Sequence, residues 1–297
     1  MSVRVAYLTS ASWRGGPVAR GALPEPDAKD FALFAPAAAA RGIQFEIRRW
    51  DDEDLAEAGF AAALIRSTWD YAQRAEAFRA RMAALESAGL RVFNPAHVVA
   101  WNARKTYLRD LEAAGIATIP THWTERVTPQ DVVRAFETFD AAELVVKPQV
   151  GAGSQATIRL RRNAWSPADL IAAPTGPAML QPFLSSIETV GETSIFVFGG
   201  TVAHTIRKRP APGNWYANVD GAEFARGEAD RAQMDVAATA IAAAPPGMLY
   251  ARVDLVAGPD GTPRVIEVEA IEPYLFLVFA PEAADALAAA LARVLDG

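Results

Sequence analysis

The stretch Val145-Val146-Lys147-Pro148-Gln149-Val150-Gly151-Ala152-Gly153-Ser154-Gln155-Ala156 decides between two folds. Its G-x-G-x-x-A pattern after an apolar strand is typical of dinucleotide-binding domains, where the glycines open a helix. Here the following residues alternate apolar and polar side chains over 156–160, as a strand does. The glycines are therefore expected in a strand–loop–strand hairpin, a glycine flap whose backbone amides could approach phosphate oxygens.

Lys147 ends the first strand of this hairpin and would supply a positive charge beside the flap. A plain flexible hairpin is the alternative for a glycine-rich loop taken alone. An unpaired ammonium in an apolar strand is costly, which favours a site that gives this lysine an anionic partner.

Upstream of the flap, strand and helix patterns alternate. Strands are expected at 3–8, 43–50, 61–66 and 90–93, and helices at 30–41 and 72–88. This alternation predicts an open parallel sheet with ligands beyond the carboxyl ends of its strands. The loop Ser67-Thr68-Trp69-Asp70-Tyr71 directly follows a strand and is the expected ligand-facing loop of this half.

Downstream of residue 95 the pattern becomes α+β with short antiparallel strands. Helices are expected at 102–114, 230–244 and 281–295, and strands at 145–147, 156–160, 178–181, 193–198, 202–208, 249–257 and 264–270. The predicted fold class is α/β, with an N-terminal open parallel α/β domain followed by two α+β lobes. We expect the boundaries at residues 1–95, 96–184 and 185–297.

The last two strands form a hairpin that carries acidic residues at alternate positions. Arg252 and Asp254 share one face, Glu267 and Glu269 share one face, and an even pairing register would make these the same face. Converging carboxylates stay ionised only beside a cation, and oxygen ligands near phosphate suit Mg²⁺. A solvent-facing hairpin with ordinary acidic residues is the alternative.

The segment from Met179 to Leu184 is extended and could be a hinge that offers backbone groups to a purine. Glu192 follows it and could accept ribose hydroxyls, although a domain linker with an unrelated glutamate is the simpler alternative. The basic run at 207–209 could meet a terminal phosphate or could be a solvated strand end.

Composition excludes several classes of protein. The 297 residues are 51% hydrophobic and 22% charged, and no apolar stretch approaches a membrane span. A formal charge of −6 disfavours nucleic acid as a partner. The chain has no cysteine and only three histidines, which excludes thiolate chemistry and disfavours a histidine metal site. The early polar residues argue against a signal peptide, so a cytoplasmic location is expected.

In combination, these features resemble the ATP-grasp ligase family over residues 95–280. The resemblance implies ATP and Mg²⁺ as cofactors and an amino-acid-like substrate that is activated by phosphorylation and then attacked by an amine nitrogen. It implies phosphate or nucleotide contacts for Lys105, Lys147, Gly151, Gly153, Ser154, Gln181, Phe183, Leu184 and Glu192. It implies metal ligation by Asp254, Glu267 and Glu269, and catalytic roles for Arg252 and Lys208. Many members have Asn where Glu269 stands here.

Within the family, the strings at 66–71, 101–102, 151–154 and 271–277 resemble the O-ureido-serine cyclo-ligases and their uncharacterised relatives. This implies an acceptor pocket suited to intramolecular cyclisation, with Arg66 also available for a substrate carboxylate. Its expected residues are Ser67, Trp69, Asp70, Arg207, Glu272 and Tyr274. A catalytically inactive ATP-binding regulatory module is the alternative function, a dinucleotide oxidoreductase is a weaker one, and a homodimer is possible.

Overall fold

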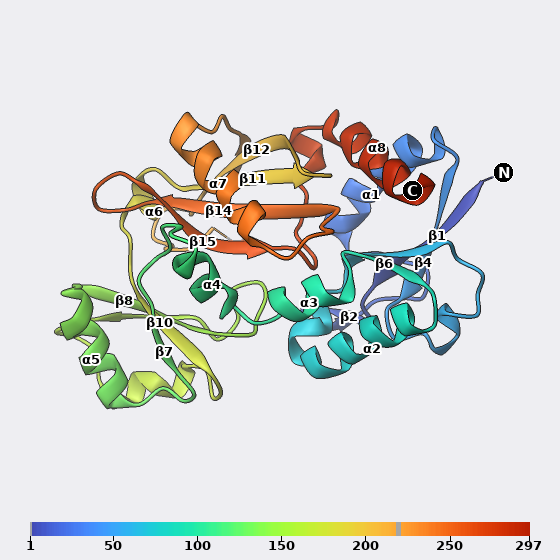
Figure 1. Ribbon diagram of the computed structural model, residues 1–297. Coiled ribbons are helices and arrows are strands. Elements are labelled where there is room, and N and C mark those ends of the chain that lie inside the picture. Colours follow the sequence, from blue (N-terminus) through green and yellow to red (C-terminus); the bar gives the residue numbers. More distant parts are fainter. Residues whose placement is uncertain (1, 218–220) are drawn as a thin grey trace.

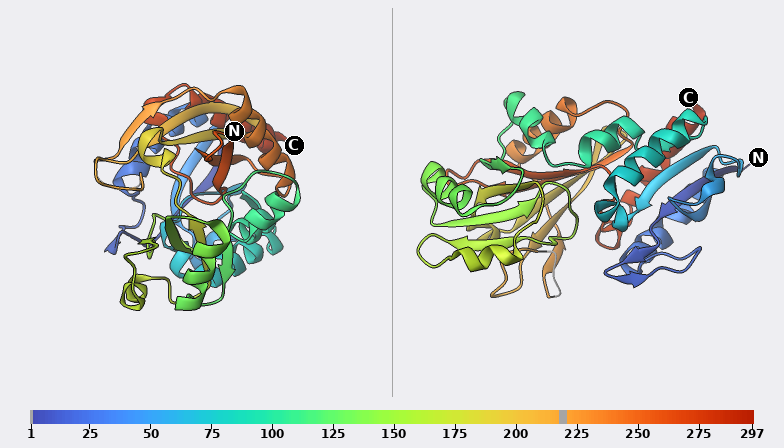
Figure 2. Two further views of the ribbon diagram at one scale, coloured as in Figure 1. Left: turned by 90° about the vertical axis from the view of Figure 1, so that its left-hand side faces the viewer. Right: turned by 90° about the horizontal axis from the view of Figure 1, so that it is seen from below.

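The computed structural model describes residues 2–217 and 221–297. In these residues it contains one four-stranded parallel sheet, two antiparallel sheets of four and five strands, and one two-stranded pair (Figure 1). The parallel sheet lies at one end of the molecule, and both antiparallel sheets lie at the other end (Figure 2). A mixed α/β fold with this order of units confirms the predicted fold class. None of the described helices is long and apolar enough to cross a membrane.

The N-terminal sheet has the strand order β4-β1-β5-β6, and every neighbouring pair is parallel. Its strands are β1 (Val3–Thr9), β4 (Ile43–Arg49), β5 (Ala62–Ser67) and β6 (Arg91–Phe93). The helices that cover it are α1 (Glu25–Ala39), α2 (Ala75–Ser87) and, from the far end of the chain, α8 (Ala283–Asp296). The small pair β2 (Ser12–Trp13) and β3 (Gly16–Pro17) lies outside this sheet.

Side-chain alternation along β1 determines which helix covers which face. Val5 and Tyr7 join one core cluster with Phe34 of α1 and residues of α8, while Leu8 joins a second cluster with Phe78 of α2. Because successive residues of a strand point to opposite faces, one face receives α1 and α8 and the other receives α2. The first and last helices of the chain thus pack against each other, as Figure 1 shows.

The two antiparallel sheets have the orders β7-β10-β8-β9 and β13-β12-β11-β14-β15. The first contains β7 (His122–Thr124), β8 (Glu143–Pro148), β9 (Ile158–Arg161) and β10 (Ala178–Pro182), covered by α5 (Pro129–Phe139). The second contains β11 (Glu192–Phe198), β12 (Thr201–Arg209), β13 (Glu223–Arg226), β14 (Tyr250–Ala257) and β15 (Pro263–Glu269). Helices α4 (Tyr107–Ala113) and α7 (Arg231–Ala243) pack on the second, and α6 (Ser186–Thr189) lies between the sheets in sequence.

The prediction of a single helix over 102–114 is wrong. Two helices occur instead, α3 (Ala96–Asn102) and α4, with a break at residues 103–106. At this break the Lys105 amide donates to the Gln149 carbonyl, 2.7 Å away, so the backbone leaves the helical pattern to meet the flap. Helix α1 also begins five residues before the predicted start, because Pro26 fits the first helical turn.

The glycine-rich stretch connects β8 directly to β9, and these strands pair in antiparallel fashion. No helix follows the glycines, so the strand–loop–strand prediction is confirmed and the dinucleotide fingerprint is excluded. Backbone φ values of +62° at Gly153 and +59° at Ser154 curl the loop through the left-handed region that glycine adopts most readily. We call residues 149–157 the glycine flap.

Candidate functional site

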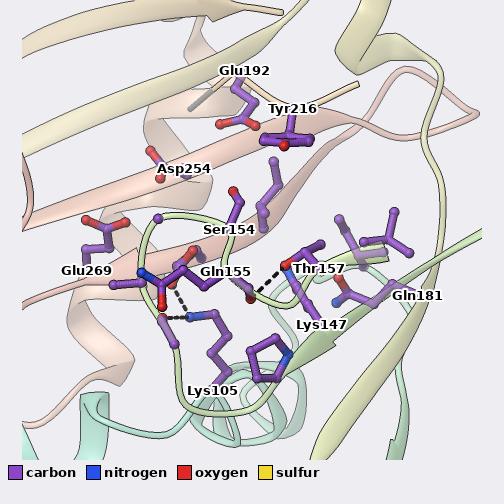
Figure 3. Close-up of a pocket in the computed structure, with 18 of the residues that line it drawn as sticks. Lys105, Lys147, Ser154, Gln155, Thr157, Gln181, Glu192, Tyr216, Asp254 and Glu269 are labelled. Atoms are coloured by element: carbon purple, nitrogen blue, oxygen red, sulfur yellow. Dashed lines mark hydrogen bonds and ion pairs between the residues drawn. The ribbon is translucent and has the colours of Figure 1, made fainter. Parts of the chain in front are cut away.

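A cavity lies between the two antiparallel sheets and is bounded by the glycine flap (Figure 3). It encloses about 1160 Å³, including the space at its mouth. Among the described residues, four cationic and five acidic side chains line it, and all nine belong to residues selected from the sequence. They are Lys105, Lys147, Lys208, Arg252, Glu192, Asp254, Glu267, Glu269 and Glu272.

The register of β14 and β15 determines how the acidic residues meet. Next to the turn, Leu255 pairs with Val265, and continuing that register would place Asp254 opposite Ile266. The register instead shifts between Asp254 and Leu255, so that Asp254 pairs with Glu267 and Arg252 pairs with Glu269. This irregularity leaves Ile266 as the extra residue of a β-bulge. Without it, Asp254 and Glu267 would lie on opposite faces, so the bulge is what brings the carboxylates together.

Cationic side chains separate these carboxylates. Arg252 Nη2 lies 2.8 Å from Asp254 Oδ2 and 2.5 Å from Glu269 Oε1, and thereby bridges the two strands. Lys208 Nζ lies 2.8 Å from Glu192 Oε2 and 3.3 Å from Asp254 Oδ2. Asp254 therefore stands between two cations. Burial favours its neutral form, but Arg252 and Lys208 outweigh burial and hold the pKa of Asp254 below its usual value.

At Glu269 the influences that raise the pKa prevail over those that lower it. Burial raises the pKa of Glu269 to about 7, and the neighbouring Glu267 and Asp254 carboxylates add to the rise, while Arg252 opposes it. Asp254 and Glu269, on the two strands of one hairpin, thus have pKa values below and above the ordinary carboxyl range. Pairs of this kind are typical of functional sites.

The two lysines expected to bind phosphate enter the cavity from separate elements. Lys105 Nζ lies 2.6 Å from Glu267 Oε1 and donates to the Gly151 carbonyl, 2.9 Å away, which ties the flap to β15. The side chain of Lys147 forms no hydrogen bond or ion pair with another residue of the described ranges, although its backbone pairs with β10. Burial lowers the pKa of Lys147 to about 8. Its ammonium is thus available to pair with an anionic ligand in the cavity.

Apolar side chains line the end of the cavity at the predicted hinge. Leu184 packs with Ile119 and Ile266, and Phe183 carries the Arg159 guanidinium over its ring, 3.6 Å from the ring centre. Gln181 is held in place because its side-chain amide donates to Thr121 Oγ1, 2.8 Å away. The apolar walls and the single amide are suited to the face and edge of a purine.

Sequence reasoning missed two aromatic side chains at the cavity, Trp215 and Tyr216. Figure 3 places Tyr216 beside Glu192, across from the flap residue Ser154. Trp215 meets Phe183 edge to face, with 6.4 Å between ring centres. The segment that carries them has no periodic pattern, so only its aromatic content could have signalled a role.

The residues expected at the acceptor pocket divide into two groups. Glu272 lines the cavity together with Tyr71, which the sequence placed in the same loop as the other candidates. Five candidates lie outside the residues that line it, namely Ser67, Trp69, Asp70, Arg207 and Tyr274.

Hydrogen bonds to other residues account for several of these positions. Asp70 accepts from Trp50 Nε1 at 2.7 Å, and Trp69 Nε1 donates to Asp27 at 2.6 Å. Arg207 is exposed because it alternates with Lys208 along β12.

Arg66 is almost fully buried at the carboxyl end of β5, with 2% of its surface exposed. Its guanidinium lies over the Tyr250 ring, 4.7 Å from the ring centre, and Nη2 donates to the Pro273 carbonyl at 2.6 Å. Arg66 therefore holds the loop that follows β15 rather than facing the cavity.

The oxygen donors of the hairpin fit Mg²⁺ only in company with phosphate. Among the described residues, no group of three His, Cys, Asp or Glu side chains is arranged to hold a metal ion by itself. Asp254 and Glu267 nevertheless lie opposite each other on paired strands, next to Lys105 and Lys147. Mg²⁺ is commonly held by one or two carboxylates plus substrate phosphates, and this donor set meets that requirement.

Comparisons with known proteins agree with this geometry. Residues 5–94 match the family model of the N-terminal domain of D-cycloserine synthetase DcsG. The cycloserine biosynthesis protein DcsG of Streptomyces lavendulae is 34% identical over 269 residues, which are 85% of this chain and 89% of that protein. The chain is a member of the DcsG family of ATP-grasp ligases.

Solved structures support the same family. The crystal structure of D-cycloserine synthetase DcsG superposes with a TM-score of 0.85 at 30% identity, over 98% of this chain and 99% of that chain. A D-alanine–D-alanine ligase of Bacillus anthracis, solved with ATP, shares the fold at a TM-score of 0.69 and 16% identity, over 100% and 96% of the two chains. This member of the DcsG family is therefore an enzyme, a ligase that uses ATP to form C–N bonds.

Proposed function

We propose that this chain uses Mg·ATP to cyclise an O-ureido-serine-type amino acid. The observation that carries the proposal is the shared face of β14 and β15, which presents Arg252, Asp254, Glu267 and Glu269 to the cavity that holds the two phosphate-binding candidates Lys105 and Lys147. The 34% sequence identity with the cycloserine biosynthesis protein DcsG supports the choice of substrate class.

The nucleotide would lie along the cavity from the hinge to the flap. Gln181, Phe183 and Leu184 would contact the adenine, and Glu192 would accept ribose hydroxyls. Lys105, Lys147 and the flap residues Gly151, Gly153 and Ser154 would hold the phosphates. Asp254 and Glu267, with Glu269 as a third candidate ligand, would hold Mg²⁺, which neutralises charge on the phosphates when it is bound.

The reaction would take place in two displacements. A carboxylate oxygen of the substrate attacks the γ-phosphorus and ADP leaves, which converts the carboxylate into an acyl phosphate. The nitrogen bonded to the serine side-chain oxygen then attacks the acyl carbon and loses its proton as phosphate leaves. This closes a five-membered ring whose nitrogen still carries the carbamoyl group. The enzyme's contribution is the positioning of both reacting groups and the neutralisation of charge by its lysines.

Arg252 and Lys208 are the candidates for stabilising the second displacement. Arg252 commits Nε and Nη2 to carboxylates, whereas its Nη1 makes only a 3.5 Å contact with the Tyr274 carbonyl. Nη1 is thus the donor available to a developing oxyanion. Lys208 lies on β12, is 1% exposed and would face the transferred phosphoryl group.

The test is ADP release with Mg·ATP and O-ureido-D-serine or O-ureido-L-serine, followed by mass spectrometry of the products. Turnover that depends on the amino acid, stops with EDTA and falls in Asp254→Asn supports the proposal. ATP binding without ADP release for either enantiomer contradicts it and favours a regulatory module. The mass of the chain in solution would show whether it is the homodimer considered from the sequence. We place the reaction in the cytoplasm, where ATP is supplied.

A further inference from the structure

Glu272 is the one carboxyl group of the cavity that the rest of the described chain leaves without a hydrogen bond or ion pair. The other four each contact a cationic side chain: Glu192 and Asp254 contact Lys208, Glu267 contacts Lys105, and Glu269 contacts Arg252. Glu272 is only 4% exposed, yet it lines the same cavity. A desolvated carboxylate without a partner is costly, so a ligand that brings a positive charge would bind favourably here.

The backbone on both sides of Glu272 is held by side chains from three other elements. The Ile271 carbonyl accepts from Tyr250 Oη at 2.9 Å, and the Pro273 carbonyl accepts from Arg66 Nη2 at 2.6 Å. Further along, the amide of Leu275 donates to Asp30 at 3.0 Å. A free carboxyl group on so firmly held a loop is preorganised for a ligand rather than available by chance.

The position of Glu272 separates it from the nucleotide hinge. It follows Glu269 of β15, and Figure 3 places Glu269 and the hinge residue Gln181 on opposite sides of the pocket. The residues on either side of Glu272 bond Tyr250 of β14 and Arg66 of β5, so Glu272 lies where the N-terminal sheet meets the sheet of the hairpin. Tyr71, in the short 3-10 helix after β5, lines the same cavity.

We propose that Glu272 binds the α-ammonium group of the substrate and thereby selects a free amino acid over an N-acylated or des-amino compound. The inference rests on the proposed function for the class of substrate. An ammonium at Glu272 would leave the substrate carboxylate directed toward Lys147 and the phosphates. Among the carboxylates of the described residues that line the cavity, the other four each contact a cation, so Glu272 is the one available to bind the amino group.

The test compares O-ureido-serine with its analogue that has hydrogen in place of the α-amino group, in the wild-type chain and in Glu272→Gln. The wild-type chain should bind the amino compound at least about tenfold more tightly, as expected for one charge-assisted contact. In Glu272→Gln this preference should disappear while ATP affinity stays unchanged. Glu112→Gln, at an exposed position of α4, is the matched control and should keep the preference.

Each other result has a defined meaning. Equal loss of affinity for both compounds in Glu272→Gln indicates a structural role and overturns the inference. A raised Mg²⁺ requirement with the preference intact indicates a metal ligand and also overturns it. A wild-type chain that binds neither compound refutes the ammonium site, whereas one that prefers the amino compound but releases no ADP supports the site and refutes the proposed reaction.

Discussion

Replacing Lys147 by methionine should weaken ATP binding by at least about tenfold. The Lys147 ammonium faces the cavity without a partner among the residues that the structure describes, so a phosphate would be its principal counterion. A hydrogen bond to a charged group contributes about 1.5–3 kcal/mol, and each 1.4 kcal/mol corresponds to a factor of ten in affinity. Methionine is also unbranched and lacks only the position of the terminal ammonium, so the substitution removes the charge and keeps most of the side-chain volume.

The same lysine should make ATP affinity depend on pH. Burial lowers the pKa of Lys147 to about 8, so most molecules carry the ammonium at pH 7. At pH 9, one unit above that value, only about one molecule in ten carries it. Because apparent affinity scales with the competent fraction, the dissociation constant should rise about tenfold between pH 7 and pH 9. The affinity is lost as pH rises, since the protonated form binds the anion.

Calorimetric titration with Mg·ATP at pH 7, 8 and 9 measures both effects. In Lys147→Met the dissociation constant at pH 7 should be higher than in the wild-type chain, and it should stay nearly constant from pH 7 to pH 9. The control is Lys29→Met, since the Lys29 side chain is 58% exposed and its one ion pair within the described residues is with Glu25 on α1. A Lys147→Met chain with wild-type affinity and wild-type pH dependence would refute the placement of a phosphate at this lysine.

Three further substitutions test the scaffold. Arg252→Lys keeps the charge but replaces three nitrogens by one, so a lysine that pairs with the carboxylates has no second nitrogen like Nη1 for the oxyanion. The kcat should fall at least about tenfold while ATP affinity changes little, and an unchanged kcat in steady-state kinetics would argue against a catalytic role. Asn94→Ala removes a fully buried amide that bonds three backbone groups at 2.6–2.8 Å, and urea unfolding should show a loss of about 3 kcal/mol, whereas a loss below about 1 kcal/mol would contradict this. Gly191→Ala would place a Cβ 2.4 Å from the Lys208 carbonyl at a φ of +91°, so its melting temperature should drop clearly.

Much of the fold could be predicted because local patterns and global architecture agree. The alternation of strands and helices before residue 95 indicated the parallel sheet, and the two-residue period after Ala156 excluded a helix behind the glycines. The break between α3 and α4 could not be predicted, since it exists to let Lys105 meet the flap, a contact between distant segments. Tertiary contacts of this kind leave no local signal.

The acidic hairpin shows where sequence reasoning reaches its limit. Alternation groups residues within one strand, but pairing between strands depends on the register. The bulge at Ile266 sets that register, and neither the turn residues nor the composition of β15 predicts a bulge there. The loop expected at the acceptor pocket follows β5 as predicted, and its Tyr71 lines the cavity, whereas Trp69 and Asp70 bond Asp27 and Trp50 outside it. Sequence alone does not show which side chains of such a loop have partners elsewhere in the fold.

The packing of α8 against α1 has a consequence for how the protein is made. Leu287 and Leu291 of α8 share one core cluster with Val5, Tyr7 and Phe34 of the N-terminal domain, and α8 packs directly on α1. During synthesis this cluster therefore cannot be completed until α8 has been made. A chain truncated before residue 283 lacks the whole of α8 and would leave its apolar partners on α1 exposed to solvent and prone to aggregate.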